Sequence, residues 1–273
     1  MVSEPRSVVI PGGVAPPLRL SPAAWRELVR HLVLRNLRVK YQRSVLGFVW
    51  TLLNPLLTIG VLFAVFRFVV RLPVPHYWAF LLSGYFVWSF TQQTLTAATA
   101  VLPEHAHLSR SLPLPGEALL ASTALSRLVE FLTELAIVLV LLAAFHHGGV
   151  PASFLWIPLL ILLQLALVLG LTLPIATASA FFHDVQHAIP IGLMILFYAS
   201  PVFYPARLVP EAVRPFFDLN PFASLLTLYH AALYEGRSPD LGLVALTAAE
   251  ALLIACIGYA IFRRYRALLP EII

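Results

Sequence analysis

The sequence predicts an all-α membrane protein with six transmembrane helices, an N-terminal amphipathic interface helix, and short external re-entrant helices between spans five and six. Hydrophobic residues make up 60% of the 273 residues and charged residues only 11%, whereas soluble domains carry about 25% charged residues. Apolar stretches of about 20 residues, long enough to cross a bilayer as helices, recur along the chain. We expect residues 1–20, rich in proline and glycine, to form a flexible tail and not a secretory signal.

The first predicted helix is the interface helix, over 21–44. Ser21 followed by Pro22 is typical of a helix start, because serine caps free N–H groups and proline fits the first turn. One apolar face extends to Val33, which indicates a helix lying on the cytoplasmic membrane surface. Beyond Val33 the apolar residues move to another face, so we expect the second half to pack against protein. The first face consists of Trp25, Leu28, Val29, Leu32 and Val33.

Six apolar stretches within a transmembrane domain over 45–266 predict the spans. They cover about 47–66, 77–102, 118–145, 150–182, 185–204 and 241–262. Between the last two lies an uncharged run of 16 residues, Leu219 to Tyr234, which is too short to cross and too apolar for an ordinary loop. A re-entrant or interfacial helical hairpin is expected there, because backbone groups at membrane depth must satisfy their own hydrogen bonds.

The distribution of positive charge predicts that both termini are cytoplasmic. Of the 18 Lys and Arg residues, eight lie at or before Arg43, three follow the sixth span, and Arg110 lies between spans two and three, whereas four lie on the opposite side. Positive charge collects on the cytoplasmic side of membrane proteins. We therefore expect a multi-pass membrane protein with a cytoplasmic C-terminal tail over 267–273.

Four cations crowd the end of the interface helix, just before the first span. One interpretation is that they follow the positive-inside pattern and contact anionic lipid. The other is a phosphate site for a lipid diphosphate head group, because arginine binds phosphate oxygens in a bidentate manner. The residues alone leave both interpretations open. The four are Arg35, Arg38, Lys40 and Arg43.

Three motifs resemble the ABC-2 type permeases that export polysaccharide, the membrane subunits of O-antigen, capsule and teichoic acid ABC transporters. The first is "RVKYQRSVLGFVWTLLNPLL", where the matching positions are Lys40, Tyr41, Ser44, Leu46, Gly47, Trp50, Asn54 and Pro55. In "FFHDVQHAIPIGLMILFYASPVFYP" they are Asp184, Ser200, Pro201 and Val202, with His183 where the family usually has arginine. In "LVPEAVRPFFDLNPFASLL" they are Pro210, Leu219, Asn220 and Pro221.

The resemblance implies a homodimer in the bacterial cytoplasmic (inner) membrane that exports a polyprenyl-diphosphate-linked polysaccharide with two separate ATPase subunits. ATP and Mg²⁺ then belong to the partner ATPase, and we expect no cofactor, no catalytic residue and no nucleic-acid partner for this chain. Lys40 is the only lysine and lies in no Walker A loop, which agrees with a separate ATPase. The loop over 103–117 would contact that ATPase through Leu108, Arg110, Leu112 and Pro113.

Two further groups of residues are candidates for the transport path. Trp50, Tyr198 and Tyr204 would offer flat faces to sugar rings, although aromatic residues also form belts at membrane interfaces. Arg127, Glu130 and Glu134 share a helix face at i, i+3 and i+7. Charges inside a span are costly, so these three form either a stabilising Arg127–Glu130 pair or a hydrophilic wall or transmission contact.

Other functions remain as alternatives. An ABC-2 exporter of a drug, haem, lipid, capsule or teichoic acid would have the same fold. A membrane enzyme is disfavoured, because the chain has no Asp-x-Asp motif and Ser83 has no evident histidine partner. No metal site is expected from His183, Asp184 and His187, since no third protein ligand is evident nearby and Asp184 is expected to cap the fifth span.

Overall fold

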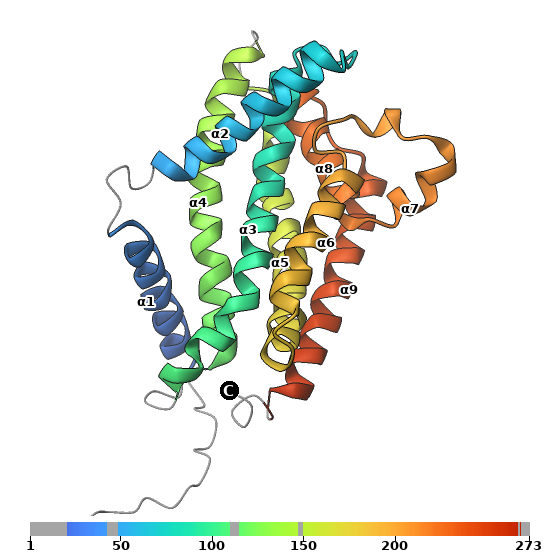
Figure 1. Cartoon of the computed structure of the whole chain (residues 1–273). Helices are drawn as coiled ribbons and strands as arrows, with labels where there is room; N and C mark the ends of the chain where they lie inside the picture. Colours follow the sequence, from blue (N-terminus) through green and yellow to red (C-terminus); the bar gives the residue numbers. More distant parts are fainter. Residues whose placement is uncertain (1–20, 43–48, 110–114, 147–149, 267, 269–273) are drawn as a thin grey trace, which may run out of the picture.

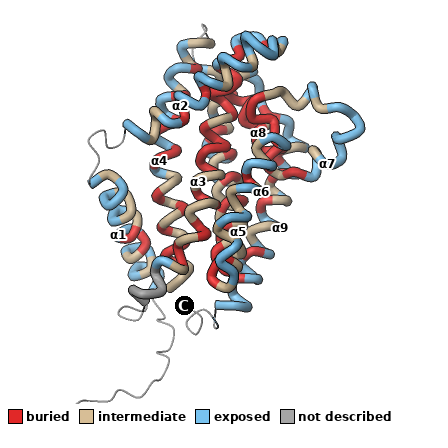
Figure 2. The backbone as a smooth tube through the Cα atoms, viewed as in Figure 1, coloured by how far each residue is buried: buried red, intermediate tan, exposed pale blue. Residues whose placement is uncertain are grey.

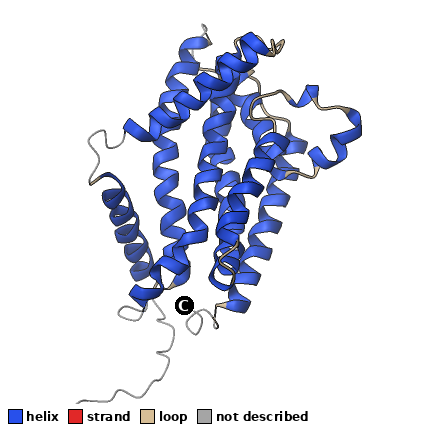
Figure 3. Cartoon of the chain, in the orientation of Figure 1, coloured by secondary structure: helices blue, strands red, loops and turns tan. Residues whose placement is uncertain are grey.

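The computed structural model describes residues 21–42, 49–109, 115–146, 150–266 and 268. Within these ranges the regular elements are all helices (Figure 3). Five of them run roughly side by side as a bundle (Figure 1), namely α3 (Tyr77–Ser109), α4 (Gly116–Phe145), α5 (Ile157–Phe181), α6 (Val185–Ala199) and α9 (Leu241–Tyr265). The predicted all-α class is confirmed.

The first two helices lie on the outside of this bundle. Helix α1 (Pro22–Tyr41) lies beside the lower half of α4, and α2 (Val49–Ala64) crosses the upper half obliquely (Figure 1). A π-helical turn, Val65–Val69, continues α2. The start of α1 and the end of α9 lie at the same end of the bundle, and Val29 and Phe262 belong to one buried cluster. The first and last described helices therefore contribute to one buried cluster at this end of the bundle.

Four of the six expected spans are long and apolar enough to cross a membrane in the described part of the chain. They are Val49–Val69, Gly116–Phe145, Ala152–Phe181 and Leu241–Tyr265. Helix α6 has only 15 residues. Helix α3 is long enough, but it carries many polar residues, which lie buried among the other helices (Figure 2); they include Ser83, Ser89, Thr91, Thr94 and Thr99.

The segment between α6 and α9 is built of short helices. Two 3₁₀ turns, Ala206–Leu208 and Glu211–Val213, lead into α7 (Arg214–Asp218), which projects from the bundle (Figure 1). Helix α8 (Pro221–Tyr229) follows and ends in a π-helical turn, His230–Tyr234. Most of the uncharged run noted in the sequence, from Pro221 to Tyr234, thus forms one continuous and largely buried helix packed on α3, α5 and α9, whereas Leu219 before it is exposed.

Helices α5 and α9 approach each other most closely at two glycines. A Cβ atom added to Gly170 would lie 2.7 Å from Ala255 Cα, and one added to Gly258 would overlap the Gly170 carbonyl oxygen. Small residues let two helix backbones pack closely inside a membrane, where van der Waals contact drives association. The α5–α9 contact therefore has no space for a side chain at either position.

Two expected features differ from the structure. The apolar face of α1 packs on protein, because Val29 and Leu32 are buried in one cluster with Val101, Leu119 and Phe262. Helix α4 is the main neighbour of this face, which was expected to lie on lipid. Helix α3 also continues through Pro103 to Ser109, so the first part of the loop expected over 103–117 is helical. The predicted tail over 1–20 lies outside the described residues.

Candidate functional site

A cluster of charged side chains lies where the end of α1 meets the middle of α4. Glu130, only 4% exposed, accepts hydrogen bonds from Lys40 Nζ at 2.7 and 2.8 Å, from the Tyr41 hydroxyl at 2.7 Å, and from Arg127 Nη1 at 3.0 Å. A buried carboxylate is costly unless it is paired and hydrogen-bonded. Lys40 and Tyr41 therefore fix the end of α1 to α4, and Arg127 pairs with Glu130 within α4.

The protonation of the two α1 residues suits this role. Burial lowers the pKa of Lys40 below its usual value, and the hydrogen bond to Glu130 offsets part of this decrease. Burial, followed by the hydrogen bond to Glu130, raises the pKa of Tyr41. The Tyr41 hydroxyl therefore stays protonated and donates a hydrogen bond to the carboxylate.

The third predicted intramembrane charge lines a small cavity beside this cluster. Glu134 is 3% exposed and faces a cavity of about 10 Å³ between α3 and α4, which has room for about one water molecule. Gln93, Arg127 and Glu130 also line this cavity, and Arg127 Nη1 lies 3.4 Å from Gln93 Oε1. The structure thus contains the predicted Arg127–Glu130 pair and places Glu134 on the same interior face.

The four cations proposed to hold a head group differ in their surroundings. Lys40 bonds Glu130, whereas Arg35 and Arg38 lie on the exposed surface of α1. Arg35 Nη2 is 3.4 Å from Asn36 Oδ1. Arg43 lies outside the described residues. Three of the four cations are therefore described as exposed residues of α1, and one of them, Lys40, also bonds an internal carboxylate.

The three aromatic residues proposed for the path fall into two places in one chain. The Tyr204 hydroxyl donates to the Tyr198 carbonyl at 3.0 Å, and Phe203 packs against both rings. Phe203 also stacks on Phe66, beyond the end of α2, at 4.8 Å between ring centroids. Trp50 lies at the start of α2 and is 45% exposed. Phe66 lies 16 positions after Trp50, which corresponds to about 24 Å along a helix.

Two of the sequence motifs meet at the end of α6. The Asn220 amide donates to Ser200 Oγ at 2.8 Å and its oxygen accepts the Phe222 backbone N–H at 3.0 Å, which caps α8. The Ser-Pro-Val turn after α6 is therefore tied directly to the first turn of α8. The Tyr77 hydroxyl of α3 donates to the Phe203 carbonyl of the same turn at 2.6 Å.

Replacing Asn220 with alanine should destabilise this joint. The variant loses both the helix cap and a buried hydrogen bond, for an expected cost of about 1–2 kcal/mol. Thermal unfolding of the purified protein in detergent would show a melting temperature lower by several degrees. Asn36→Ala, at the exposed surface of α1, is the matched control and should melt like the parent; equal melting of both variants would contradict the role of Asn220.

Ser83 has a histidine partner that the sequence did not reveal. His230 Nε2 donates to the Pro201 carbonyl at 2.9 Å, so Nδ1 is left to accept the Ser83 hydroxyl at 2.8 Å. Phe80 stacks on the imidazole at 4.0 Å, and burial lowers the pKa of His230 to about 4. Ser83 has no exposed surface. The pair therefore joins α3, the Ser-Pro-Val turn and the end of α8, and offers no accessible nucleophile.

Gln164 is a second interior polar residue that sequence reasoning missed. It is fully buried, donates to the Val87 carbonyl at 2.8 Å, and accepts the Tyr229 hydroxyl at 2.9 Å. It thereby links α5 to α3 and α8. Its position as a lone amide in an otherwise apolar stretch was a usable signal, because a polar side chain in a span seeks a partner.

Other expected positions are less informative. Leu108 lies in the last turn of α3, and Arg110, Leu112 and Pro113 lie outside the described residues. Asp184 precedes α6, but its side chain makes no capping hydrogen bond. Its backbone is helical, and a capping residue usually needs an extended conformation to reach the free N–H groups.

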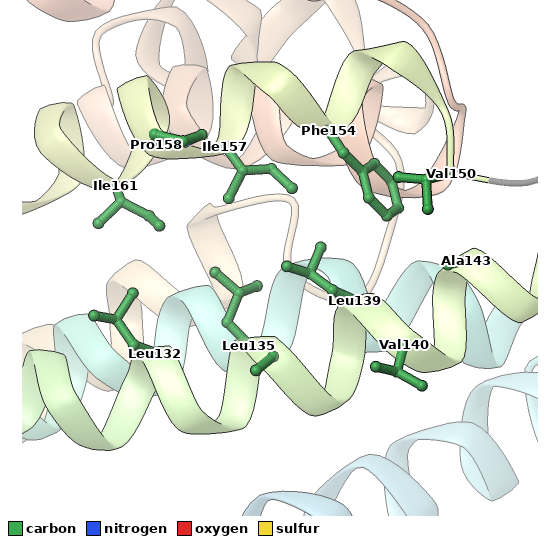
Figure 4. Close-up of a pocket in the computed structure, with 11 residues that line it drawn as sticks. Leu132, Leu135, Leu139, Val140, Ala143, Val150, Phe154, Ile157, Pro158 and Ile161 are labelled. Carbon is green, nitrogen blue, oxygen red and sulfur yellow. The ribbon is translucent and has the colours of Figure 1, made fainter.

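A larger groove lies between α4 and α5 (Figure 4). It has a volume of about 520 Å³ and is lined by apolar side chains, among them Leu132, Leu139, Phe154 and Ile161. Such a surface offers neither cations for phosphate nor hydrogen bonds for sugar. The charged cluster at α1 and α4 is therefore the better candidate for recognition of a polar ligand.

Comparison with known proteins assigns the family. Residues 27–234 match the ABC-2 type transporter model. The chain is 33% identical over 233 residues to the O-antigen export system permease protein RfbA of Myxococcus xanthus, covering 84% of this chain and 89% of that protein. It is 25% identical over 241 residues to the protein of the same name from Klebsiella pneumoniae (88% and 92%). It is 22% identical over 238 residues to the polysialic acid transport protein KpsM of Escherichia coli (86% and 92%). With most of its length matched, this chain is a membrane transport subunit that belongs to the ABC-2 type transporter family.

Proposed function

We propose that this chain is the permease subunit of an ABC exporter that moves a polyprenyl-diphosphate-linked polysaccharide of the O-antigen type across the bacterial cytoplasmic membrane. The observation that carries the proposal is the 33% identity to an O-antigen export permease over 84% of the chain. Capsule is the second candidate cargo, because the chain also aligns over 86% of its length with a polysialic acid transport protein.

The proposed topology has six spans with both termini cytoplasmic. Helices α3 and α6 supply the second and fifth spans in addition to the four apolar ones. The enclosure of α3 by other helices supports this role, because a covered helix need not present an apolar surface to lipid. Helices α7 and α8 are the proposed external elements, and α8 is the re-entrant one.

The head group of the cargo binds first at α1 in this proposal. Arg35 and Arg38 on the exposed surface of α1, together with Lys40 and Arg43, are the cations that attract the diphosphate. Two copies of the chain enclose the path, and the aromatic faces of Trp50, Tyr198 and Tyr204 line parts of it. Flat rings let sugars slide, since they offer few hydrogen bonds that would hold the polymer.

Energy comes from two separate ATPase subunits in this proposal. They bind ATP and Mg²⁺ and dock below the membrane at the segment containing Leu108, Arg110, Leu112 and Pro113. This segment joins α3 to α4, and α4 carries Glu130 and the contact to α1. A movement of the docked segment would therefore be transmitted to the head-group site by one helix, α4.

Co-purification with candidate ATPases tests the function. We expect ATP hydrolysis by the complex to rise when the lipid-linked glycan is added. In the Arg35→Gln/Arg38→Gln variant the half-maximal glycan concentration should rise about tenfold or more, because each charge-assisted hydrogen bond contributes about 1.5–3 kcal/mol.

The matched control is Arg26→Gln/Arg30→Gln, which removes the same charge from the exposed start of the same helix. Its half-maximal concentration should stay at the parent value. An equal effect of both double variants would point to general attraction by anionic lipid and contradict a head-group site. Hydrolysis that no glycan stimulates would contradict the proposed cargo.

A further inference from the structure

The three donors around Glu130 form a cage that suits a phosphate group as well as a carboxylate. The Lys40 ammonium, the Tyr41 hydroxyl and the Arg127 guanidinium converge on the two oxygens of one buried carboxylate, at 2.7–3.0 Å. Ammonium, guanidinium and hydroxyl groups are the donors that bind phosphate oxygens. The Glu130 carboxylate therefore occupies a site that could also bind a phosphate group.

The cage is accessible from the side of its donors. The Lys40 side chain is 35% exposed and that of Arg127 is 26% exposed, whereas that of Glu130 is only 5% exposed. Arg35 and Arg38 lie on the exposed surface of α1 within two turns of Lys40. An anion that collects at α1 thus meets Lys40 before it meets Glu130.

We propose that Glu130 is a built-in competitor for the lipid-borne diphosphate. The bound head group takes Lys40, Tyr41 and Arg127 from Glu130 and thereby releases the end of α1 from α4. This inference rests on the proposed function, because it takes the diphosphate of the cargo as the competing anion. Under this inference Tyr41 and Arg127 also bind the head group, and Glu130 sets the affinity of these donors for the diphosphate.

The charges around Glu130 explain why we expect the head group to displace Glu130 from its donors and not to bind beside it. In the described state two cations, Lys40 and Arg127, face Glu130, with Glu134 one turn away. A displaced Glu130 loses its partners, and an unpaired buried charge is costly. The competitor therefore weakens head-group binding, so that neutralising it should strengthen binding. A purely structural clamp predicts the opposite, because its loss would disorder the donors.

Direct binding of farnesyl diphosphate to the purified full chain in detergent tests the exchange. We expect Glu130→Gln to bind at least about tenfold more tightly than the parent, a difference of about 1.4 kcal/mol. The matched control is Glu117→Gln on the same helix, which loses the same charge at a more exposed pair with Arg266. The control should bind like the parent. Farnesol and pyrophosphate, as separate probes, distinguish the lipid from the free anion.

Cross-linking gives a second measurement that needs no variant. Lys40 is the only lysine in the chain, and its ammonium lies 2.7 Å from the Glu130 carboxylate. A water-soluble carbodiimide should join the two as an amide, detected by mass spectrometry as one cross-linked peptide pair. Farnesyl diphosphate should lower the yield of this product several-fold, while farnesol should leave it unchanged.

The outcomes separate this inference from the function on which it rests. Equal affinity of the parent and Glu130→Gln, with cross-linking undiminished by bound farnesyl diphosphate, would overturn the exchange and leave a head-group site at Arg35 and Arg38 intact. Failure of every diphosphate probe to bind any variant would overturn the head-group site itself. Equal binding of pyrophosphate and farnesyl diphosphate would overturn the lipid-borne part of the inference.

Discussion

Gly258→Ala should prevent α9 from packing on α5 and leave little folded protein in the membrane. The new methyl group would overlap the Gly170 carbonyl oxygen, and neither backbone can move without opening the contact between α5 and α9. Overpacking a close-fitting interior costs about 1–3 kcal/mol, and more where backbone must shift. The yield of monodisperse protein after detergent extraction, measured by size-exclusion chromatography, should fall severalfold.

Two other glycines provide the control for this substitution. A Cβ atom added to Gly60 or Gly192 meets no atom within 4 Å, and both lie inside helices, where alanine is favoured over glycine by about 1 kcal/mol. Gly60→Ala and Gly192→Ala should therefore be extracted at least as well as the parent. A normal yield of Gly258→Ala would mean that α5 and α9 pack differently in the membrane.

Acid should destabilise the protein through His230. Burial lowers its folded-state pKa to about 4, against about 6.5 in an unfolded chain. The unfolded state therefore binds the proton more tightly, and the stability gained from a neutral His230 is complete above pH 6.5 and is lost as the pH falls toward 4. The difference corresponds to about 3 kcal/mol. Melting temperatures recorded between pH 7.5 and pH 4.5 should fall over this range.

His230→Gln should flatten this dependence, because glutamine donates to the Pro201 carbonyl without titrating. The variant should be less stable than the parent at pH 7.5 and lose less stability at pH 4.5. His31→Gln removes an exposed imidazole that faces Glu27 and should retain the parental pH profile. A parental profile in His230→Gln would assign the acid sensitivity to other groups.

Local patterns in the sequence predicted the helices well. The third apolar stretch and the last one begin and end within a few residues of the observed helices, and Ser21 caps α1 by accepting the Ala24 N–H at 3.2 Å. Helix length, caps and apolar periodicity depend on neighbouring residues, so one sequence is enough to recognise them. The second and fifth expected spans, α3 and α6, are not among the four helices that are long and apolar enough to cross, because α3 carries many polar residues and α6 has only 15 residues.

Contacts between distant residues were not predictable in the same way. Lys40 and Glu130 are 90 positions apart, and Ser83 and His230 are 147 positions apart. A helical pattern identifies the face on which a charge lies, but it does not name the residue that faces it. The cost of an isolated charge in a span required a partner for Glu130. The spacing along the helix suggested Arg127, and only the arrangement of the helices added Lys40 and Tyr41.

The polar character of α3 has a consequence for how the protein is made. Insertion of a helix by the translocon depends on its own apolarity, and α3 carries buried serines and threonines that suit contact with other helices better than contact with lipid. The helices that cover it, α4 and α5, are synthesised later. Helix α3 should therefore remain beside the translocon until they emerge, so that insertion of α3 is coupled to synthesis of α4 and α5.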